Sequence, residues 1–213
     1  MNPLNTYLDH TLLKADATPQ DIRNVVSEAI EFKTASVCVN TCYASLVSNA
    51  LKDSGVKTCV VVGFPLGAMS TPAKALEAAL AVRDGAEEVD MVLNVGLAKA
   101  GLWDAVQTDI SAVVLASKPA IVKVILETCL LTDAEKVSAC LAAKAAGAAF
   151  VKTSTGFSTG GATVADVALM RKTVGPEMGV KASGGVRTRE QAEAMIAAGA
   201  SRIGCSSTRK IME

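Results

Sequence analysis

One local pattern constrains the fold of this chain more than any other: alanine-rich stretches end in a glycine and lead directly into short apolar runs. The pattern occurs at 85–90, 147–152 and 199–204. Glycine accommodates the left-handed conformation that is common at helix ends, and a short apolar run bounded by such a signal is typical of a buried strand. The chain is therefore predicted to alternate helices with short strands.

Threonines mark the starts of several of these helices. Thr18 precedes a proline at the first helical position, and Thr132 and Thr188 are followed three residues later by Glu135 and Gln191. A threonine hydroxyl at this position accepts a bond from a free backbone N–H, and the acidic or amide side chain returns it. Helices are therefore predicted to begin directly after each threonine.

Eight strands follow from these marks, and a helical pattern comes after each of the first seven. The tail at 206–212 has room for only a short helix. Short apolar strands alternating with helices imply parallel pairing, so we predict a single-domain (β/α)₈ barrel over 1–213, with an open doubly wound sheet as the alternative. The predicted strands are 7–9, 36–40, 57–62, 88–93, 120–126, 150–152, 179–182 and 202–205.

Composition excludes several classes of function. The 21 basic residues balance the 21 acidic ones, and only 3% of residues are aromatic, so neither a nucleic-acid nor a membrane-surface role is supported. The single histidine, His10, excludes metal sites built from several histidines, and no metal is expected. If the chain is an enzyme, its proton chemistry should rest on Lys, Asp, Glu, Cys or Tyr.

The cellular location is predicted from the cysteines and from the first residues. Six cysteines are scattered through apolar segments without a C-x-x-C motif, which suits buried, reduced thiols. Residues 1–5 lack the charged and apolar regions of a signal peptide, and no apolar run is long enough to span a membrane. We therefore expect a cytoplasmic protein without membrane contact.

Three charged residues stand where a barrel carries its chemistry, at the carboxyl ends of strands. Lys152 and Lys181 end neighbouring predicted strands, and Asp90 has the repeat position of Lys152, so the three should face one compartment. A lysine amine is a nucleophile only when neutral, and a neighbouring ammonium lowers the pKa of such a lysine. The pattern indicates either Schiff-base catalysis or an interior Lys–Asp–Lys ion pair that stabilises the barrel.

Other polar residues in or near strands favour a structural role. Lys123 lies mid-strand with Glu127 at the same parity, which predicts an ion pair between them. Cys38 is expected to be a buried small side chain that could face the cavity. Asp9 and its neighbours at the end of the first strand could bind a substrate hydroxyl, although His10 alone is more typical of a structural histidine.

Two glycine-containing loops suit a phosphate group. Residues 183–187 follow the seventh predicted strand and 204–207 follow the eighth, where barrel enzymes often bind phosphate with backbone N–H groups. Thr155 and Gly156, in the sixth loop, could add further donors. The predicted phosphate-side residues in the last two loops are Gly184, Gly185, Ser206 and Ser207.

Taken together, these segments resemble the 2-deoxyribose-5-phosphate aldolase family along essentially the whole chain. The resemblance implies a Schiff-base lyase of deoxyribose phosphate catabolism on a (β/α)₈ barrel. It would reversibly split 2-deoxy-D-ribose 5-phosphate into D-glyceraldehyde 3-phosphate and acetaldehyde without a metal or cofactor. The matching stretches are LDHTLLKADAT, SVCVNTCYA, VVGFPLGA, EVDMVLNVG, VKVILETCLLT, FVKTSTGFSTGGAT, VKASGGVRT and RIGCSS.

The resemblance also assigns roles by motif. It implies that Lys152 of KTSTGF forms the imine, that Lys181 of KASGG lowers the pKa of that lysine and helps to move protons, and that Asp90 of EVDMV takes part in proton transfer. Asp9 and Cys38 match substrate-side positions. The glycines and serines of the sixth, seventh and eighth loops match the phosphate side. A homodimer and small-molecule partners, a sugar phosphate and aldehydes, are expected.

Two features depart from many members of that family, and two other functions remain open. Thr41-Cys42 stands where many members have a proline, and the sequence ends at Glu213 without the tyrosine-terminated tail of some members. A transaldolase-like Schiff-base enzyme would use ketose phosphates, so a substrate panel would distinguish it. A non-catalytic sugar-phosphate-binding barrel should have lost one of Lys152, Lys181 and Asp90.

Overall fold

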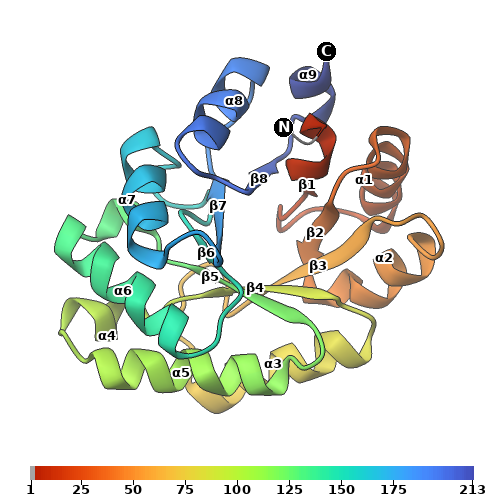
Figure 1. The fold of residues 1–213 in the computed structure, drawn as a ribbon. Coiled ribbons are helices and arrows are strands. Elements are labelled where there is room, and N and C mark those ends of the chain that lie inside the picture. Colours follow the sequence, from red (N-terminus) through yellow and green to blue (C-terminus); the bar gives the residue numbers. More distant parts are fainter. Residues whose placement is uncertain (1–2) are drawn as a thin grey trace.

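A computed structural model describes residues 3–213, which form a closed barrel of eight parallel strands with helices around its outside (Figure 1). The strands pair in chain order, and the last closes on the first. The strands are β1 (Leu8–Thr11), β2 (Ser36–Asn40), β3 (Lys57–Val62), β4 (Glu88–Val92), β5 (Ile121–Ile125), β6 (Phe150–Lys152), β7 (Gly179–Ser183) and β8 (Arg202–Cys205).

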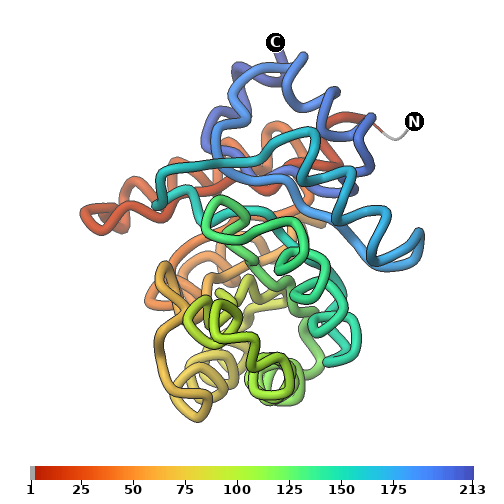
Figure 2. The backbone as a smooth tube through the Cα atoms, turned by 90° about the vertical axis from the view of Figure 1, so that its left-hand side faces the viewer, coloured from red at the N-terminus to blue at the C-terminus, as the bar shows by residue number. Residues whose placement is uncertain are grey.

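The helices form the outer layer, which Figure 2 shows from the side. The α-helices are α1 (Pro19–Phe32), α2 (Ala44–Ala50), α3 (Thr71–Arg83), α4 (Val95–Lys99), α5 (Trp103–Ala116), α6 (Asp133–Ala145), α7 (Val164–Val174), α8 (Arg189–Ala197) and α9 (Thr208–Met212). The short 3₁₀ helices are η1 (Leu4–Tyr7), η2 (Thr41–Tyr43) and η3 (Thr128–Leu130).

The predicted barrel is confirmed, and so are most strand boundaries. Strands β2, β3, β6 and β8 have the predicted ends, β4 and β7 differ by one residue at one end, and β5 is one residue shorter at each end. Strand β1 lies later than predicted, because Tyr7 ends η1 and the strand continues to Thr11. The extra helix α4 was not predicted; it begins where the Asn94 side chain accepts a hydrogen bond from the backbone N–H of Leu97.

The three predicted helix starts are confirmed at atomic level. The hydroxyls of Thr18, Thr132 and Thr188 each accept a bond from the backbone N–H three residues on. In each case the side chain at that third position bonds back to the threonine N–H, which completes a capping box. These caps fix where the helix after a loop begins, and so they fix the length of the loops at the carboxyl ends of the strands.

The apolar core is divided by the sheet. A large cluster lies between the strands and the helices, and a small one lies inside the barrel, made of Leu13, Cys38, Cys59 and Val61 with Phe64 against it. The rest of the barrel interior is therefore available for polar side chains. No helix within residues 3–213 combines the length and the apolar composition that a bilayer span requires.

Candidate active site

Every strand of the barrel contributes at least one titratable side chain to the interior. Neighbouring parallel strands place register partners side by side: Asp90 lies beside Lys123, and Lys152 lies beside Lys181. Most of these side chains are fully buried. In strand order the residues are Asp9, Cys38, Cys59, Glu88 with Asp90, Lys123, Lys152, Lys181 and Arg202.

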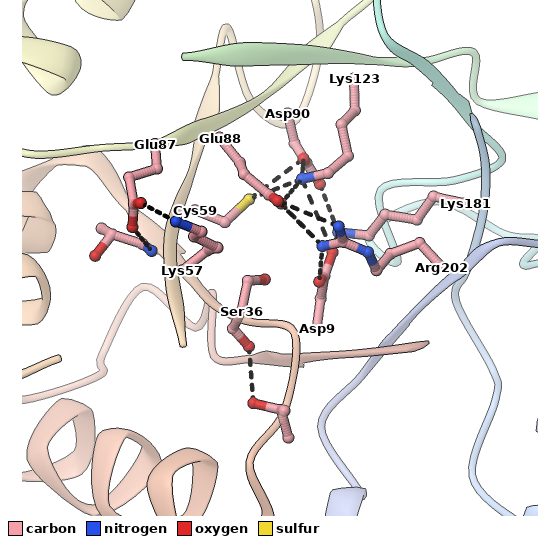
Figure 3. Close-up of polar contacts among 12 residues, drawn as sticks. Asp9, Ser36, Lys57, Cys59, Glu87, Glu88, Asp90, Lys123, Lys181 and Arg202 are labelled. Carbon is pink, nitrogen blue, oxygen red and sulfur yellow. Dashed lines mark hydrogen bonds and ion pairs between the residues drawn. The ribbon is translucent and has the colours of Figure 1, made fainter. Parts of the chain in front are cut away.

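Six of these charged groups form a closed ring of alternating sign (Figure 3). Lys123 Nζ lies 2.6 Å from Glu88 Oε2 and 2.7 Å from Asp90 Oδ1. Lys181 Nζ lies 2.8 Å from Asp90 Oδ2 and 2.5 Å from Asp9 Oδ2. The Arg202 guanidinium closes the ring, 2.7 Å from Asp9 Oδ1 and 3.0 Å from Glu88 Oε2.

Lys152 stands outside this ring and is the cation in excess. Its Nζ lies 2.8 Å from Asp90 Oδ2, an oxygen that also accepts from Lys181. Within residues 3–213, Asp90 is its only ion-pair partner. The ring holds three cations and three anions, so a charged Lys152 would leave one positive charge uncompensated in a buried site. Such a charge is costly.

Burial and neighbouring charges shift the pKa values of the ring residues in opposite directions, and the effect of the charges is the larger. Burial would raise the pKa of Asp90, but Lys123, Lys152 and Lys181 hold it well below its usual range. Burial would lower the pKa of Lys181, but Asp9 and Asp90 raise it above its ordinary value. The pKa of Lys123 is raised well above its ordinary value in the same way, chiefly by Asp90. Asp90, Lys123 and Lys181 are therefore in their charged forms, and the Lys181 ammonium lies beside Lys152.

A pocket of about 320 Å³ opens above Lys152 at the carboxyl ends of the strands. Of the predicted site residues, Lys152, Thr155, Gly156, Gly184, Gly185 and Ser206 line it. Asp9, Cys38, Asp90 and Lys181 are buried inside the barrel and do not line it, and Ser207 does not line it either. The lining residues that were not predicted include Lys14 and Phe157, which lie in the stretches LDHTLLKADAT and FVKTSTGFSTGGAT but were given no role there.

The glycines at the pocket have backbones that other residues rarely adopt. Gly156, Gly184 and Gly185 have φ values of 84°, 89° and 84°. Within residues 3–213 their N–H groups donate to no protein acceptor, and a Cβ on Gly156 or Gly185 would meet nothing within 4 Å. The pocket mouth therefore presents free backbone donors at the positions where the sequence predicts phosphate binding.

The predicted pairing of Lys123 with Glu127 is wrong, although the prediction of a structural ion pair for Lys123 is right. Lys123 pairs with Glu88 and Asp90, two strand residues deep in the barrel. Glu127 lies beyond β5 with φ 55°, where it accepts hydrogen bonds from the N–H and the hydroxyl of Thr155. Glu127 thus holds the loop that carries Gly156.

His10 is structural, as its isolation in the sequence suggested. Its Nε2 lies 3.0 Å from Glu28 Oε2 on α1, and its Nδ1 lies 2.8 Å from the hydroxyl of Thr208 on α9. Burial lowers the pKa of His10 below its ordinary value, and Glu28 opposes that effect. The His10 imidazole therefore joins the first strand to two outer helices and does not line the pocket.

Gly204 makes room for the lysine that stands beside it. A Cβ at this position would lie 3.1 Å from Cε of Lys181 and 2.3 Å from Oγ of Ser183. Any larger residue would displace the Ser183 hydroxyl and crowd the end of the Lys181 side chain. The glycine in RIGCSS is therefore required by packing inside the barrel as well as by the loop that follows.

Among residues 3–213, one group has ligand atoms close enough together to hold a metal ion: Cys38, Cys59 and Asp90, whose ligand atoms lie within 4.8 Å of one another. Both oxygens of Asp90 already accept from the ammonium groups of Lys123 and Lys181, and Cys59 Sγ lies 3.3 Å from Lys123 Nζ. A cation here would have to displace those ammonium groups, so the donor set does not fit a resident metal.

The sequence and the structure are similar to those of known aldolases. Residues 4–213 match the DeoC/LacD family aldolase model. A deoxyribose-phosphate aldolase from Clostridium novyi is 64% identical over 99% of this chain and 95% of its own, and one from Streptococcus suis is 59% identical over 98% and 95%. The deoxyribose phosphate aldolase of Aeropyrum pernix, whose structure is described as tetrameric, aligns with TM-score 0.92 at 37% identity over 98% and 89% of the two chains.

Proposed function

The chain belongs to the DeoC/LacD family of aldolases, and on that premise we propose that it cleaves 2-deoxyribose 5-phosphate reversibly through an imine on Lys152. The products are acetaldehyde and D-glyceraldehyde 3-phosphate. One observation carries the assignment of Lys152: it is the cation at the floor of the pocket that lies outside the neutral ring. Its neutral form leaves the buried charges balanced, and the neutral form is the nucleophile.

The first step forms the covalent intermediate. The Lys152 amine attacks the C1 aldehyde of the open-chain sugar, and loss of water gives an iminium ion. The positive charge of the iminium develops on Lys152 Nζ, which lies 2.8 Å from Asp90 Oδ2. The Asp90 carboxylate therefore stabilises that charge. The amine attacks in its neutral form, because only that form is a nucleophile.

The second step breaks the carbon–carbon bond. The iminium withdraws electrons from the C2–C3 bond while the C3 hydroxyl loses its proton, which releases the three-carbon aldehyde phosphate. The two-carbon enamine left on Lys152 takes a proton at C2, and water then releases acetaldehyde. Asp90 and Lys181, hydrogen-bonded to each other at 2.8 Å, are the groups that we propose to carry these protons.

The free N–H groups at the pocket mouth hold the other end of the substrate. We place the C5 phosphate against Gly156, Gly184, Gly185 and Ser206, with Thr155 fixed by Glu127. Backbone donors without another partner suit phosphate oxygens. As the family resemblance implies, we also propose a cytoplasmic homodimer that needs no metal.

Reductive trapping tests the covalent step directly. With acetaldehyde and sodium borohydride, the protein should gain one ethyl group, and peptide mass spectrometry should locate it on Lys152. Lys123 and Lys181 serve as internal controls, because both are buried ammonium groups of the ring. An ethyl group on either of them, or none on the protein, would refute the assignment.

A second prediction concerns the loop that Glu127 holds. Glu127→Ala removes both hydrogen bonds from Thr155, each to a charged acceptor and each contributing about 1.5–3 kcal/mol. We expect KM for 2-deoxyribose 5-phosphate to rise roughly tenfold or more, while ethyl labelling of Lys152 by acetaldehyde proceeds as in the wild type. Steady-state kinetics and the labelling rate measure the two effects.

The matched control is Glu177→Ala, an exposed glutamate in the loop between α7 and β7 at the opposite end of the barrel. It should leave KM unchanged. If Glu127→Ala also kept the wild-type KM, Glu127 would have no part in shaping the phosphate side of the pocket.

A further inference from the structure

One polar group on the pocket wall takes no part in the proposed chemistry: the hydroxyl of Ser183. Ser183 is 5% exposed, and its Oγ has no hydrogen-bond partner among residues 3–213. Its backbone is fixed, because its N–H donates to Thr153 Oγ1 and its carbonyl accepts from the same hydroxyl, both at 3.0 Å. Buried hydroxyls in proteins are normally hydrogen-bonded, so this one calls for a partner that binds in the pocket.

The position of Ser183 specifies which part of a ligand it can meet. Ser183 lies two residues after Lys181 on the same strand, so both side chains face the inside of the barrel. Gly184 and Gly185 follow it directly, and all three line the pocket together with Lys152. Ser183 therefore lies between the Lys152 amine, which reacts with C1, and the loop at Gly184 and Gly185, which binds the phosphate on C5.

The neighbouring strand leaves the space that this hydroxyl occupies. Gly204 is the register partner of Ser183, and a Cβ on Gly204 would lie only 2.3 Å from Ser183 Oγ. Because that Cβ is missing, the hydroxyl packs against the Gly204 backbone, which covers its oxygen, and it would meet a ligand by turning to another staggered position. It can thus donate to a ligand oxygen or accept from a ligand hydroxyl.

Resting on the proposed function, we propose that Ser183 is a specificity-determining residue that hydrogen-bonds the C4 hydroxyl of the sugar phosphate. That hydroxyl is the C2 hydroxyl of the three-carbon aldehyde in the reverse direction. The C3 oxygen is the reacting one and is served by Asp90 and Lys181, which leaves the C4 hydroxyl, next to the phosphate-bearing carbon, for Ser183. The enzyme should therefore prefer 2-hydroxyaldehydes to their 2-deoxy counterparts.

Two acceptors that differ only in this hydroxyl test the proposal. Acetaldehyde is added by the enzyme to D-glyceraldehyde or to 3-hydroxypropanal, and kcat/KM is compared for the wild type and Ser183→Ala. We expect kcat/KM for D-glyceraldehyde to fall about three- to tenfold, the value of one neutral hydrogen bond. The value for 3-hydroxypropanal should change by less than about twofold. Cleavage of 2-deoxyribose 5-phosphate should fall as for D-glyceraldehyde.

Two further measurements separate recognition from structure. Ser183→Ala breaks no hydrogen bond within residues 3–213, so its Tm should not fall, and ethyl labelling of Lys152 by acetaldehyde should keep its rate. Ser117→Ala is the matched control, since Ser117 Oγ is also buried and without a partner but lies after α5, at the other end of the barrel. It should leave the preference between the two acceptors unchanged.

The outcomes distinguish this inference from the proposed function. If Ser183→Ala lowers kcat/KM equally for both acceptors, or for neither, Ser183 does not bind the hydroxyl and the inference is wrong. An equal loss accompanied by a lower Tm would assign Ser183 a structural role instead. If the wild type itself fails to cleave 2-deoxyribose 5-phosphate, the proposed function fails, whatever the acceptor preference.

Discussion

Lys152→Leu is expected to lower kcat for 2-deoxyribose 5-phosphate at least about 10⁴-fold while leaving the barrel folded. The variant removes the amine that forms the imine, and leucine cannot replace it. It leaves the ring of Asp9, Glu88, Asp90 and its three cationic partners intact, because Lys152 is not a member of that ring. Loss of activity should therefore come without a matching loss of stability.

Three measurements check this result: coupled-assay turnover, ethyl labelling and a urea unfolding curve. The matched control is Lys172→Leu, an exposed lysine in the last turn of α7, which should keep wild-type turnover. Turnover within about tenfold of the wild type in Lys152→Leu would exclude the covalent mechanism. Lost turnover with an unfolded protein would instead show that Lys152 stabilises the barrel.

Asp90→Asn is expected to damage both activity and stability. Lys123, Lys152 and Lys181 all donate to its carboxylate, and an amide has no charge and only one acceptor oxygen. Loss of proton transfer and of iminium stabilisation should lower kcat by about 10²–10⁴-fold. Breaking a buried ion pair by removing one partner costs about 3–5 kcal/mol of unfolding free energy.

The comparison between the two variants is the informative result. Urea unfolding at neutral pH should give a lower midpoint for Asp90→Asn than for Lys152→Leu, since only Asp90→Asn takes an anionic partner from the ring cations Lys123 and Lys181. The same order should appear in Tm. If Asp90→Asn proves as stable as Lys152→Leu, the alternating ring does not hold the barrel interior together.

Local signals explain why so much of the fold could be predicted from the sequence. A capping threonine or a closing glycine acts within a few residues, so Thr18, Thr132, Thr188 and the repeated glycines mark helix ends without reference to the rest of the chain. The repeat also placed Asp90 and Lys152 in one compartment, because equivalent positions in equivalent units of a closed barrel face the same way. Their 2.8 Å contact agrees with that prediction.

Contacts that depend on the stagger of the strands could not be predicted. Lys123 was assigned to Glu127 by parity along one strand, but the barrel sets Glu88 and Asp90 of the neighbouring strand beside it. Arg202 and Asp9 are 193 positions apart and meet only because β8 closes on β1. No pattern within a single segment contains that information.

The closed ring also limits how this enzyme can change over generations. Because each charge in it contacts two of opposite sign, a single substitution at Glu88 or Arg202 leaves two neighbours unbalanced at once. A tolerated route must change adjacent members together, and intermediates with one change pass through a less stable protein. Variation should thus accumulate at the rim of the pocket, where Lys14 and Phe157 can be replaced one at a time.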